Sequence, residues 1–304
     1  MNESVVSIKG LIKRYGSFTA VGGIDMEVGR GEVFGLLGPN GAGKTTTLEC
    51  LEGMRKVSGG RLRVAGCDPQ SQERALRRKL GVQLQSSALP DSICVGEALT
   101  LISAWHGLPG QSDLIRRFEI GDLLKKQYRQ LSAGQKRRLH LVLALVNHPE
   151  VLVLDEPTAG LDVQSRAQLH EEIRSVKAQG ITVLLATHDM AEAEALCDRI
   201  AIMIHGKLAV CGTPAEVTAA GSGETRIRLR TAKGSLLPGG DVGQATFVSA
   251  KDGYLEWSCR DTASSVTELL RRIQDAGDTV DDLRVERPSL EERFLELVEG
   301  AEQK

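Results

Sequence analysis

The sequence predicts an α/β domain followed by a small α+β domain, and three observations support this fold class. Short apolar runs alternate with helical apolar spacing over the first 220 residues, as expected for a parallel sheet covered by helices. The stretch Gly221-Ser222-Gly223 has the composition of a linker. After it, residues 226–230 alternate charged and apolar side chains, which is typical of a half-buried strand. We therefore expect one domain over residues 1–220 and a second over residues 224–304.

In the first domain, apolar runs predict four buried strands, at residues 33–37, 151–154, 181–187 and 200–204. Apolar residues recur at helical spacing over residues 139–146 and again over 169–176, where Gly180 follows as a stop signal. Residues 86–148 show helical periodicity without a strand pattern. This segment is therefore expected to be a helical insert within the α/β domain.

The second domain begins after a short helix that starts at Thr213 and Pro214 and ends near Ala220. Beyond the linker, strand patterns occupy residues 226–230, 243–249, 253–259 and 283–286. Helical patterns cover residues 266–273 and 290–298. These elements together predict a small α+β accessory domain.

The composition excludes some classes of function. The 38 Lys and Arg residues oppose 40 Asp and Glu, and a net charge of −2 argues against a protein that binds nucleic acid by bulk positive charge. Residues 1–4 lack the features of a secretory signal, and no apolar run reaches the roughly 18 residues of a membrane span. We therefore expect a cytosolic chain that reaches a membrane only through a partner. The six scattered cysteines, Trp105 and Trp257 are interpreted as packing residues.

A glycine-rich loop follows the strand expected at residues 33–37 and fits the pattern G-x-x-x-x-G-K-[ST]. The loop and the adjoining threonine comprise Gly38, Pro39, Asn40, Gly41, Ala42, Gly43, Lys44, Thr45 and Thr46. In such a loop, backbone N–H groups surround a β-phosphate, and the N-terminus of the following helix adds positive potential. Lys44 is placed to reach the β- and γ-phosphates, and Thr45 can offer its hydroxyl to Mg²⁺. The sequence therefore predicts a P-loop NTPase.

Two carboxylates, Asp155 and Glu156, follow the strand expected at residues 151–154. They lie at the C-terminal tip of that strand, where ligands bind in α/β folds. Asp155 can hold the Mg²⁺ shell. Glu156, one residue further on, can orient and deprotonate a water molecule that attacks the γ-phosphate. A strand that merely ends in acidic residues is the structural alternative, and the phosphate loop makes it the weaker one.

The segment Leu131-Ser132-Ala133-Gly134-Gln135 precedes an amphipathic helix. Ser132 and Gln135 have capping-box spacing, so a plain helix cap is one interpretation. Together with the loop and the carboxylates, however, the segment resembles the LSGGQ signature of the nucleotide-binding subunits of ABC transporters. Ala133 replaces the first signature glycine, and we expect the change to be tolerated. The resemblance covers roughly residues 4–220 and implies ATP as substrate. It also implies that Ser132, Gly134 and Gln135 bind the γ-phosphate held by the partner subunit.

The same resemblance implies roles for four further residues. Tyr15 resembles the aromatic residue that stacks on adenine. Gln85 resembles the Q-loop glutamine that senses Mg²⁺ and the attacking water, with Gln83 as the competing candidate. Asp162 resembles the D-loop acid that faces the partner, although its position also suits a helix N-cap. His188 resembles the switch histidine that contacts the γ-phosphate and orients the catalytic carboxylate.

The run at residues 287–297 resembles the ending of ATPases from the ABC-2 type exporter group. This implies a peripheral ATPase subunit at the cytoplasmic face of the cell membrane. It would power export of a drug, antibiotic or lipid-like compound through a separate integral-membrane permease. One set of motifs per chain implies a homodimer that encloses two ATP molecules head to tail. A soluble ABC-type ATPase acting on ribosomes, DNA repair or Fe–S assembly is the alternative. The permease is expected to dock near residues 85–108, a segment tied to the nucleotide through Gln85.

Overall fold

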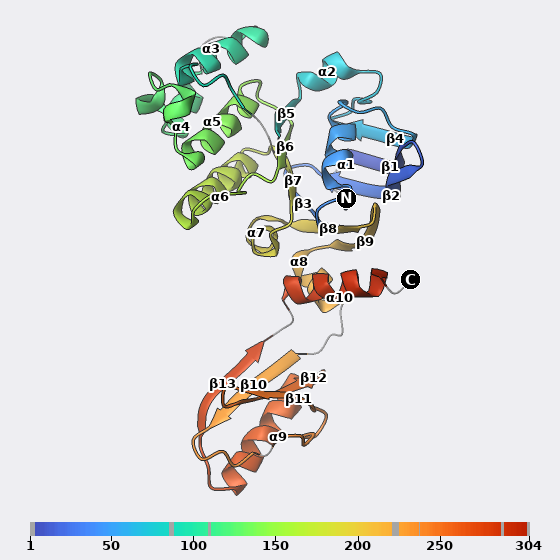
Figure 1. Cartoon of the computed structure of the whole chain (residues 1–304), viewed down its shortest axis with the longest axis vertical. Coiled ribbons are helices and arrows are strands. Elements are labelled where there is room, and N and C mark those ends of the chain that lie inside the picture. The colour runs from blue at the N-terminus through green and yellow to red at the C-terminus, as the bar shows by residue number, and fades with distance from the viewer. Residues whose placement is uncertain are drawn as a thin grey trace. The chain divides into compact units, whose positions relative to one another are not determined.

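The computed structural model describes residues 4–84, 88–108, 111–220, 225–236, 238–286 and 289–302. These residues form two units, Met1–Pro214 with two sheets and Ala215–Lys304 with one (Figure 1). Most of the short helix α8 (Pro214–Ala219) thus belongs to the second unit, whereas the first domain was expected to extend to residue 220. Residues 221–223, the expected linker, lie outside the described residues. None of the helices in the described ranges combines the length and apolar character that a membrane span requires.

A six-stranded sheet forms the centre of the first unit, with the order β5-β6-β7-β3-β8-β9. Its strands are β3 (Val33–Leu37), β5 (Leu80–Gln83), β6 (Val151–Asp155), β7 (Thr182–Thr187), β8 (Arg199–Ile204) and β9 (Lys207–Gly212). The four strands expected from apolar runs are confirmed to within one residue at each end. The sheet is parallel except at its edge, where β9 pairs antiparallel with β8. β9 was not predicted, because its side chains are alternately exposed and half-buried and form no apolar run.

A second, antiparallel sheet in this unit has the order β2-β1-β4 and was not predicted. Its strands are β1 (Ser4–Tyr15), β2 (Phe18–Gly29) and β4 (Gly59–Val64). The alternation along β1 is interrupted because its register against β2 shifts between Ile8 and Leu11, where Gly10 adopts a φ of +60°. A bulge of this kind shifts the apolar period, and the period is the signal on which strand prediction depends.

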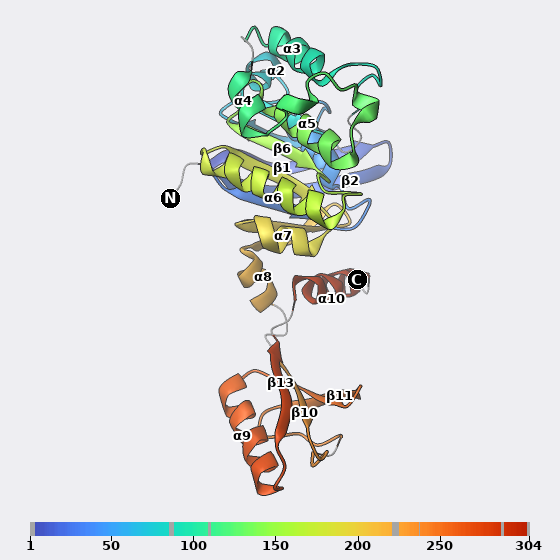
Figure 2. The same cartoon turned by 90° about the vertical axis from the view of Figure 1, so that its left-hand side faces the viewer.

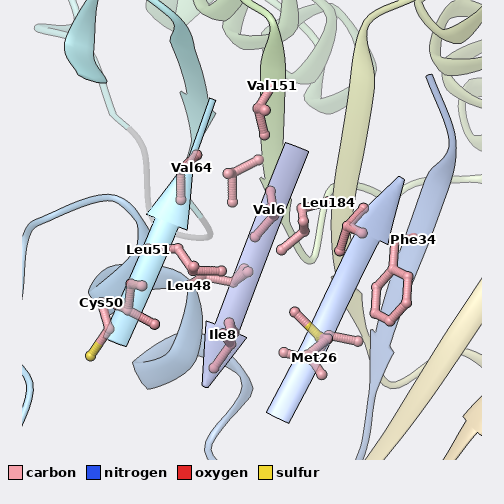
Figure 3. Packing of buried hydrophobic residues seen from close by; sticks show 14 of the residues in the cluster. Val6, Ile8, Met26, Phe34, Leu48, Cys50, Leu51, Val64, Val151 and Leu184 are labelled. Carbon is pink, nitrogen blue, oxygen red and sulfur yellow. The ribbon is translucent and has the colours of Figure 1, made fainter. Parts of the chain in front are cut away.

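The apolar core lies between the two sheets and includes the helix α1 (Lys44–Leu51), which follows the phosphate loop (Figure 3). Its side chains come from the small sheet, from α1 and from the large sheet, and include Val6, Ile8, Met26, Phe34, Leu48, Leu51, Val151 and Leu184. Packing against both sheets holds α1, and therefore the loop at its N-terminus, in one position.

Helices cover the opposite face of the large sheet (Figures 1 and 2). Between β5 and β6, the described chain forms α3 (Val95–Trp105), α4 (Ser112–Arg117), two short 3₁₀ turns and α5 (Ala133–Leu145). α6 (Val163–Ala178) precedes β7, and α7 (Met190–Leu196) precedes β8. The small helix α2 (Glu73–Arg77) precedes β5.

The packing prediction is wrong for Trp105 and confirmed for Trp257. Trp105, which was expected to be a packing residue, is 76% exposed at the end of α3. The buried side of α3 is formed by Val95, Ala98 and Leu99, and the helical period places Trp105 with Leu101 on the solvent side. Trp257 is fully buried, as expected.

The second unit contains a four-stranded antiparallel sheet with the order β11-β12-β10-β13. Its strands are β10 (Thr225–Thr231), β11 (Thr246–Lys251), β12 (Tyr254–Cys259) and β13 (Val280–Glu286). The helices are α9 (Thr262–Asp275) and α10 (Leu290–Glu302). Ile227, Leu229 and Trp257 of the sheet form the core with Leu269 and Ile273 of α9. The α+β class predicted for this part of the chain is confirmed.

Candidate active site

The phosphate loop connects β3, which is buried along its whole length, to α1. Gly43 is the N-cap of α1 and has a φ of +102°, in the left-handed region that glycine adopts without strain. A Cβ atom at this position would lie 2.6 Å from the carbonyl oxygen of Ala20. No side chain caps the helix at Gly43, so the first N–H groups of α1 are directed to the loop side. This arrangement suits a bound phosphate.

Lys44 is 6% exposed, and its ammonium group is held by the loop itself. Its Nζ donates a hydrogen bond to the carbonyl oxygen of Gly38 at 2.7 Å and lies 3.8 Å from Oε1 of Glu156. Burial lowers the pKa of Lys44, while the negative charges of Glu156 and Asp155 act in the opposite direction. The Lys44 ammonium group therefore lies against the loop backbone, next to the carboxylate of Glu156.

The Thr45 hydroxyl and the Asp155 carboxylate lie side by side next to the loop. Thr45 Oγ1 donates a hydrogen bond to Oδ2 of Asp155 at 2.9 Å, and Asp155 is 3% exposed. Oδ1 of Asp155 has no hydrogen-bond partner among the residues that the structure describes. Burial raises the pKa of Asp155, the bond from Thr45 lowers it and the nearby Glu156 raises it. A buried carboxylate oxygen without a partner, next to a hydroxyl, is a donor set that fits Mg²⁺.

Glu156 and His188 come from the ends of two adjacent strands, β6 and β7. The backbone of Glu156 has a φ of +48°, which costs a residue with a side chain about 1–3 kcal/mol. Its backbone N–H donates to the carbonyl oxygen of Ala186 at 2.9 Å, which stabilises this turn. His188 Nδ1 then lies 2.8 Å from Oε2 of Glu156. The Glu156 carboxylate is thus held between an imidazole on one oxygen and the Lys44 ammonium on the other.

A cavity of about 240 Å³ opens over the loop. Its lining comprises Tyr15, Phe18, Ala20, residues 39–46 and Glu156. Tyr15 is 40% exposed, with the Nζ of Lys13 4.7 Å from the ring centroid. Phe18 was not predicted as a site residue. It enters the cavity wall because a turn at Gly16 and Ser17 makes it the cross-strand neighbour of Tyr15, and that pairing is visible only in the structure.

The signature residues lie apart from this cavity, at the N-terminus of α5. Ser132 is the N-cap, and its Oγ accepts a hydrogen bond from the backbone N–H of Gln135. The Gln135 side chain accepts the N–H of Ser132 in return, so the capping interpretation also holds. Ala133 is exposed in the first turn of α5. Gly134 is constrained, because a Cβ there would lie 2.6 Å from Oγ of Ser165 on α6.

Asp162 is the N-cap of α6 and lies close to the signature through Ser165. Its carboxylate accepts hydrogen bonds from the backbone N–H and the hydroxyl of Ser165, at 2.9 and 2.8 Å. The N-cap alternative for Asp162 is therefore present in the structure. A second cavity, of about 250 Å³, has Ser132, Gly134, Gln135 and Ser165 in its lining. The chain thus carries two separate groups of predicted site residues.

Gln83 and Gln85 are the two candidates for the Q-loop glutamine. Gln85 lies outside the described residues. Gln83, at the end of β5, is 1% exposed, and neither atom of its side-chain amide has a partner within the described ranges.

Comparisons with known proteins agree with this architecture. Residues 21–159 match the model of the ABC transporter family. The daunorubicin resistance ATP-binding protein DrrA3 of Streptomyces coeruleorubidus is 35% identical, over 98% of this chain and 96% of that protein. The Nod factor export ATP-binding protein I of Ralstonia nicotianae is 42% identical, over 70% of this chain and 68% of that protein.

A solved structure described as the ATP binding subunit of an ABC transporter is 28% identical, with a TM-score of 0.64. It covers 70% of this chain, and 92% of that structure is matched. The sequence match to DrrA3 extends over nearly the whole of both proteins, and the fold match extends over nearly the whole of the solved subunit. The chain therefore belongs to the family of ABC transporter ATP-binding subunits, enzymes that bind and hydrolyse ATP.

Proposed function

We propose that this chain is the ATP-hydrolysing subunit of an ABC-2 type exporter and acts as a homodimer bound to a separate integral-membrane permease. The observation that supports the catalytic part is the grouping of Lys44, Asp155, Glu156 and His188 around the phosphate loop. The relatives named above are, by their names, ATP-binding proteins of daunorubicin resistance and of Nod factor export. A drug, an antibiotic or a lipid-like compound is therefore the proposed class of cargo.

In the proposed reaction, each residue has one task. The loop N–H groups and Lys44 bind the β- and γ-phosphates. Glu156 accepts the proton of the attacking water, and its hydrogen bond to His188 fixes the direction of its carboxylate. Thr45, Asp155 and Gln85 are the residues that would hold Mg²⁺, which neutralises phosphate charge when bound. Tyr15 supplies a face for the adenine ring.

The separation of the two groups of residues supports the proposed homodimer. Ser132, Gly134, Gln135 and Asp162 line the N-termini of α5 and α6 and contribute nothing to the cavity over the phosphate loop. In a head-to-tail pair of chains, these residues of one copy would face the γ-phosphate held by the other. Each chain contains one copy of each group, so two chains form two complete sites.

The permease is proposed to dock on the segment that includes α3, at the cytoplasmic face of the membrane. The side chains of Leu101 and Trp105 are 59% and 76% exposed and lie one helical turn apart. Exposed apolar residues clustered in this way are typical of a protein contact. Val95 and Leu99 on the other side of α3 are buried and belong to the core. None of the relatives described above has a name that favours the alternative, a soluble non-transport ATPase.

The Glu156→Gln variant tests the catalytic assignment. The amide cannot accept the proton of water, so the rate of ATP hydrolysis should fall at least about 100-fold. The variant should still bind ATP, because the loop and Lys44 are unchanged, and it should accumulate as an ATP-bound dimer in light scattering. Lys44→Ala is the matched comparison, since it should weaken nucleotide binding itself. Near wild-type turnover in Glu156→Gln would show that another group is the base.

A further inference from the structure

Phe18 is an exposed aromatic residue in the wall of the nucleotide cavity. Its side chain is 63% exposed, and it lines the same cavity of about 240 Å³ as Tyr15 and the phosphate loop. Phe18 begins β2 and is the register partner of Tyr15, the last residue of β1. Directly opposed residues of an antiparallel pair present their side chains on the same face of the sheet. Both side chains therefore project from the same side of the hairpin, and both line the cavity.

The surroundings of the two rings differ. The Nζ of Lys13 and the guanidinium carbon of Arg55 lie 4.7 and 5.6 Å from the centroid of the Tyr15 ring. Within the described part of the chain, no cation and no second ring makes a comparable contact with Phe18. Tyr15 thus has protein partners before any ligand binds, whereas most of the surface of Phe18 is open to solvent. A ligand that covers Phe18 would remove this apolar surface from water, which is favourable.

We propose that Phe18 forms a second aromatic wall of the base site, so that the adenine ring of bound ATP contacts both Tyr15 and Phe18. This inference rests on the proposed function. The side chain of Phe18 carries no hydrogen-bonding group, so its contribution comes from ring contact alone. Every base has a π-face, and the contribution should therefore be similar for ATP and GTP. Phe18 would raise the affinity for the nucleoside part of the substrate and leave the phosphates to the loop.

The test compares two probes, ATP and inorganic tripolyphosphate, which shares the phosphate chain but lacks a base. Binding is measured on the full chain by titration calorimetry. Phe18→Ala should weaken ATP about tenfold, equivalent to about 1.4 kcal/mol, within the usual range for a base stacked on one ring. Its affinity for tripolyphosphate should stay within about twofold of wild type. Phe18→Tyr keeps a ring at this position and should bind ATP like the wild type.

Met54→Ala is the matched control, because Met54 is 61% exposed in the same unit and lies outside the cavity lining. It should leave the affinity for both probes unchanged. An unchanged ATP affinity in Phe18→Ala would overturn the inference. An equal loss for ATP and tripolyphosphate would do the same, since the ring would then shape the loop instead of contacting the base.

Two further outcomes separate this inference from the broader assignments. A Phe18→Ala variant that binds ATP normally but no longer dimerises would place the ring in the contact between copies and overturn the inference. A wild-type chain that binds neither probe would overturn the proposed function, and the inference with it. ATP binding by the wild type together with no effect of Phe18→Ala would overturn the inference alone.

Discussion

A buried carboxylate at the C-terminal end of α1 should make the free energy of unfolding of the first unit depend on pH. Glu52 follows the last residue of α1 and is 7% exposed. Its Oε2 has no hydrogen-bond partner among the described residues. Burial raises the pKa of Glu52 from 4.5 to about 7, and the negative charges of Asp155 and Glu49 act in the same direction. We expect the substitution Glu52→Gln to remove this pH dependence.

The size of the effect follows from the pKa of the group in the two states. Below pH 4.5, Glu52 is protonated in both the folded and the unfolded chain and has no effect on the free energy of unfolding. As the pH rises, the unfolded chain ionises first, so the folded state loses relative stability until the pH passes about 7. The loss is about 1 kcal/mol at pH 5 and about 3 kcal/mol at pH 8. Between these two conditions, the wild type should therefore lose about 2 kcal/mol relative to Glu52→Gln.

The assay is urea unfolding followed by circular dichroism at several pH values between 5 and 8.5, on the wild type and on Glu52→Gln. The difference in unfolding free energy between the two proteins should grow through this range and level off above about pH 7.5. Glu171→Gln is the control, because the Glu171 side chain is 73% exposed and its loss should change stability by less than about 0.5 kcal/mol at any pH. Parallel pH profiles for the wild type and Glu52→Gln would refute the reasoning, since they would mean that Glu52 ionises equally easily in both states.

Three further predictions concern the shared sites and the partner surface. The Ser132→Arg and Lys44→Ala variants should each be inactive. An equal mixture of the two should regain about a quarter of wild-type ATPase activity, because half of the dimers are mixed and each mixed dimer retains one complete site. No recovery on mixing would contradict shared sites. Gly134→Ala should abolish hydrolysis because its Cβ would lie 2.6 Å from Oγ of Ser165. Adding Ser165→Gly to the same chain removes that oxygen and should raise kcat at least about tenfold above that of Gly134→Ala. A double variant as inactive as Gly134→Ala would show that the contact with Ser165 does not cause the loss of hydrolysis. Trp105→Asp should reduce crosslinking of the α3 region to the permease and reduce transport with it, and wild-type levels of both would exclude this surface.

Local sequence was sufficient to place the predicted catalytic groups on their elements. The phosphate loop, Asp155 with Glu156, and His188 each follow a short apolar run, and each run is a strand of the large sheet. A glycine loop of fixed spacing and acidic residues after a buried strand are local patterns that need no knowledge of distant contacts. The signature segment was recognisable for the same reason, since Ser132 and Gln135 are only three residues apart.

The antiparallel sheet could not be predicted in this way. β1 and β2 stabilise each other through cross-strand pairs, and the bulge near Gly10 interrupts the alternation that would reveal them. The position of Phe18 beside Tyr15 depends on that pairing. The exposure of Trp105 likewise depends on which side of α3 faces the core, and a tryptophan alone does not indicate the side.

The sequence by itself therefore determined the α/β class, the phosphate loop and the chemical groups proposed to act on ATP, because short-range spacing encodes each of them. The tertiary structure decided which of these groups meet. β7 lies between β6 and β3 in the sheet although it follows both in the chain, and this order brings His188 against Glu156 and Glu156 within 3.8 Å of Lys44. Strand order depends on how distant segments pack, and no local pattern carries that information. The same packing separates the Ser132 group from the phosphate loop within one chain, which is the physical basis for proposing a second copy.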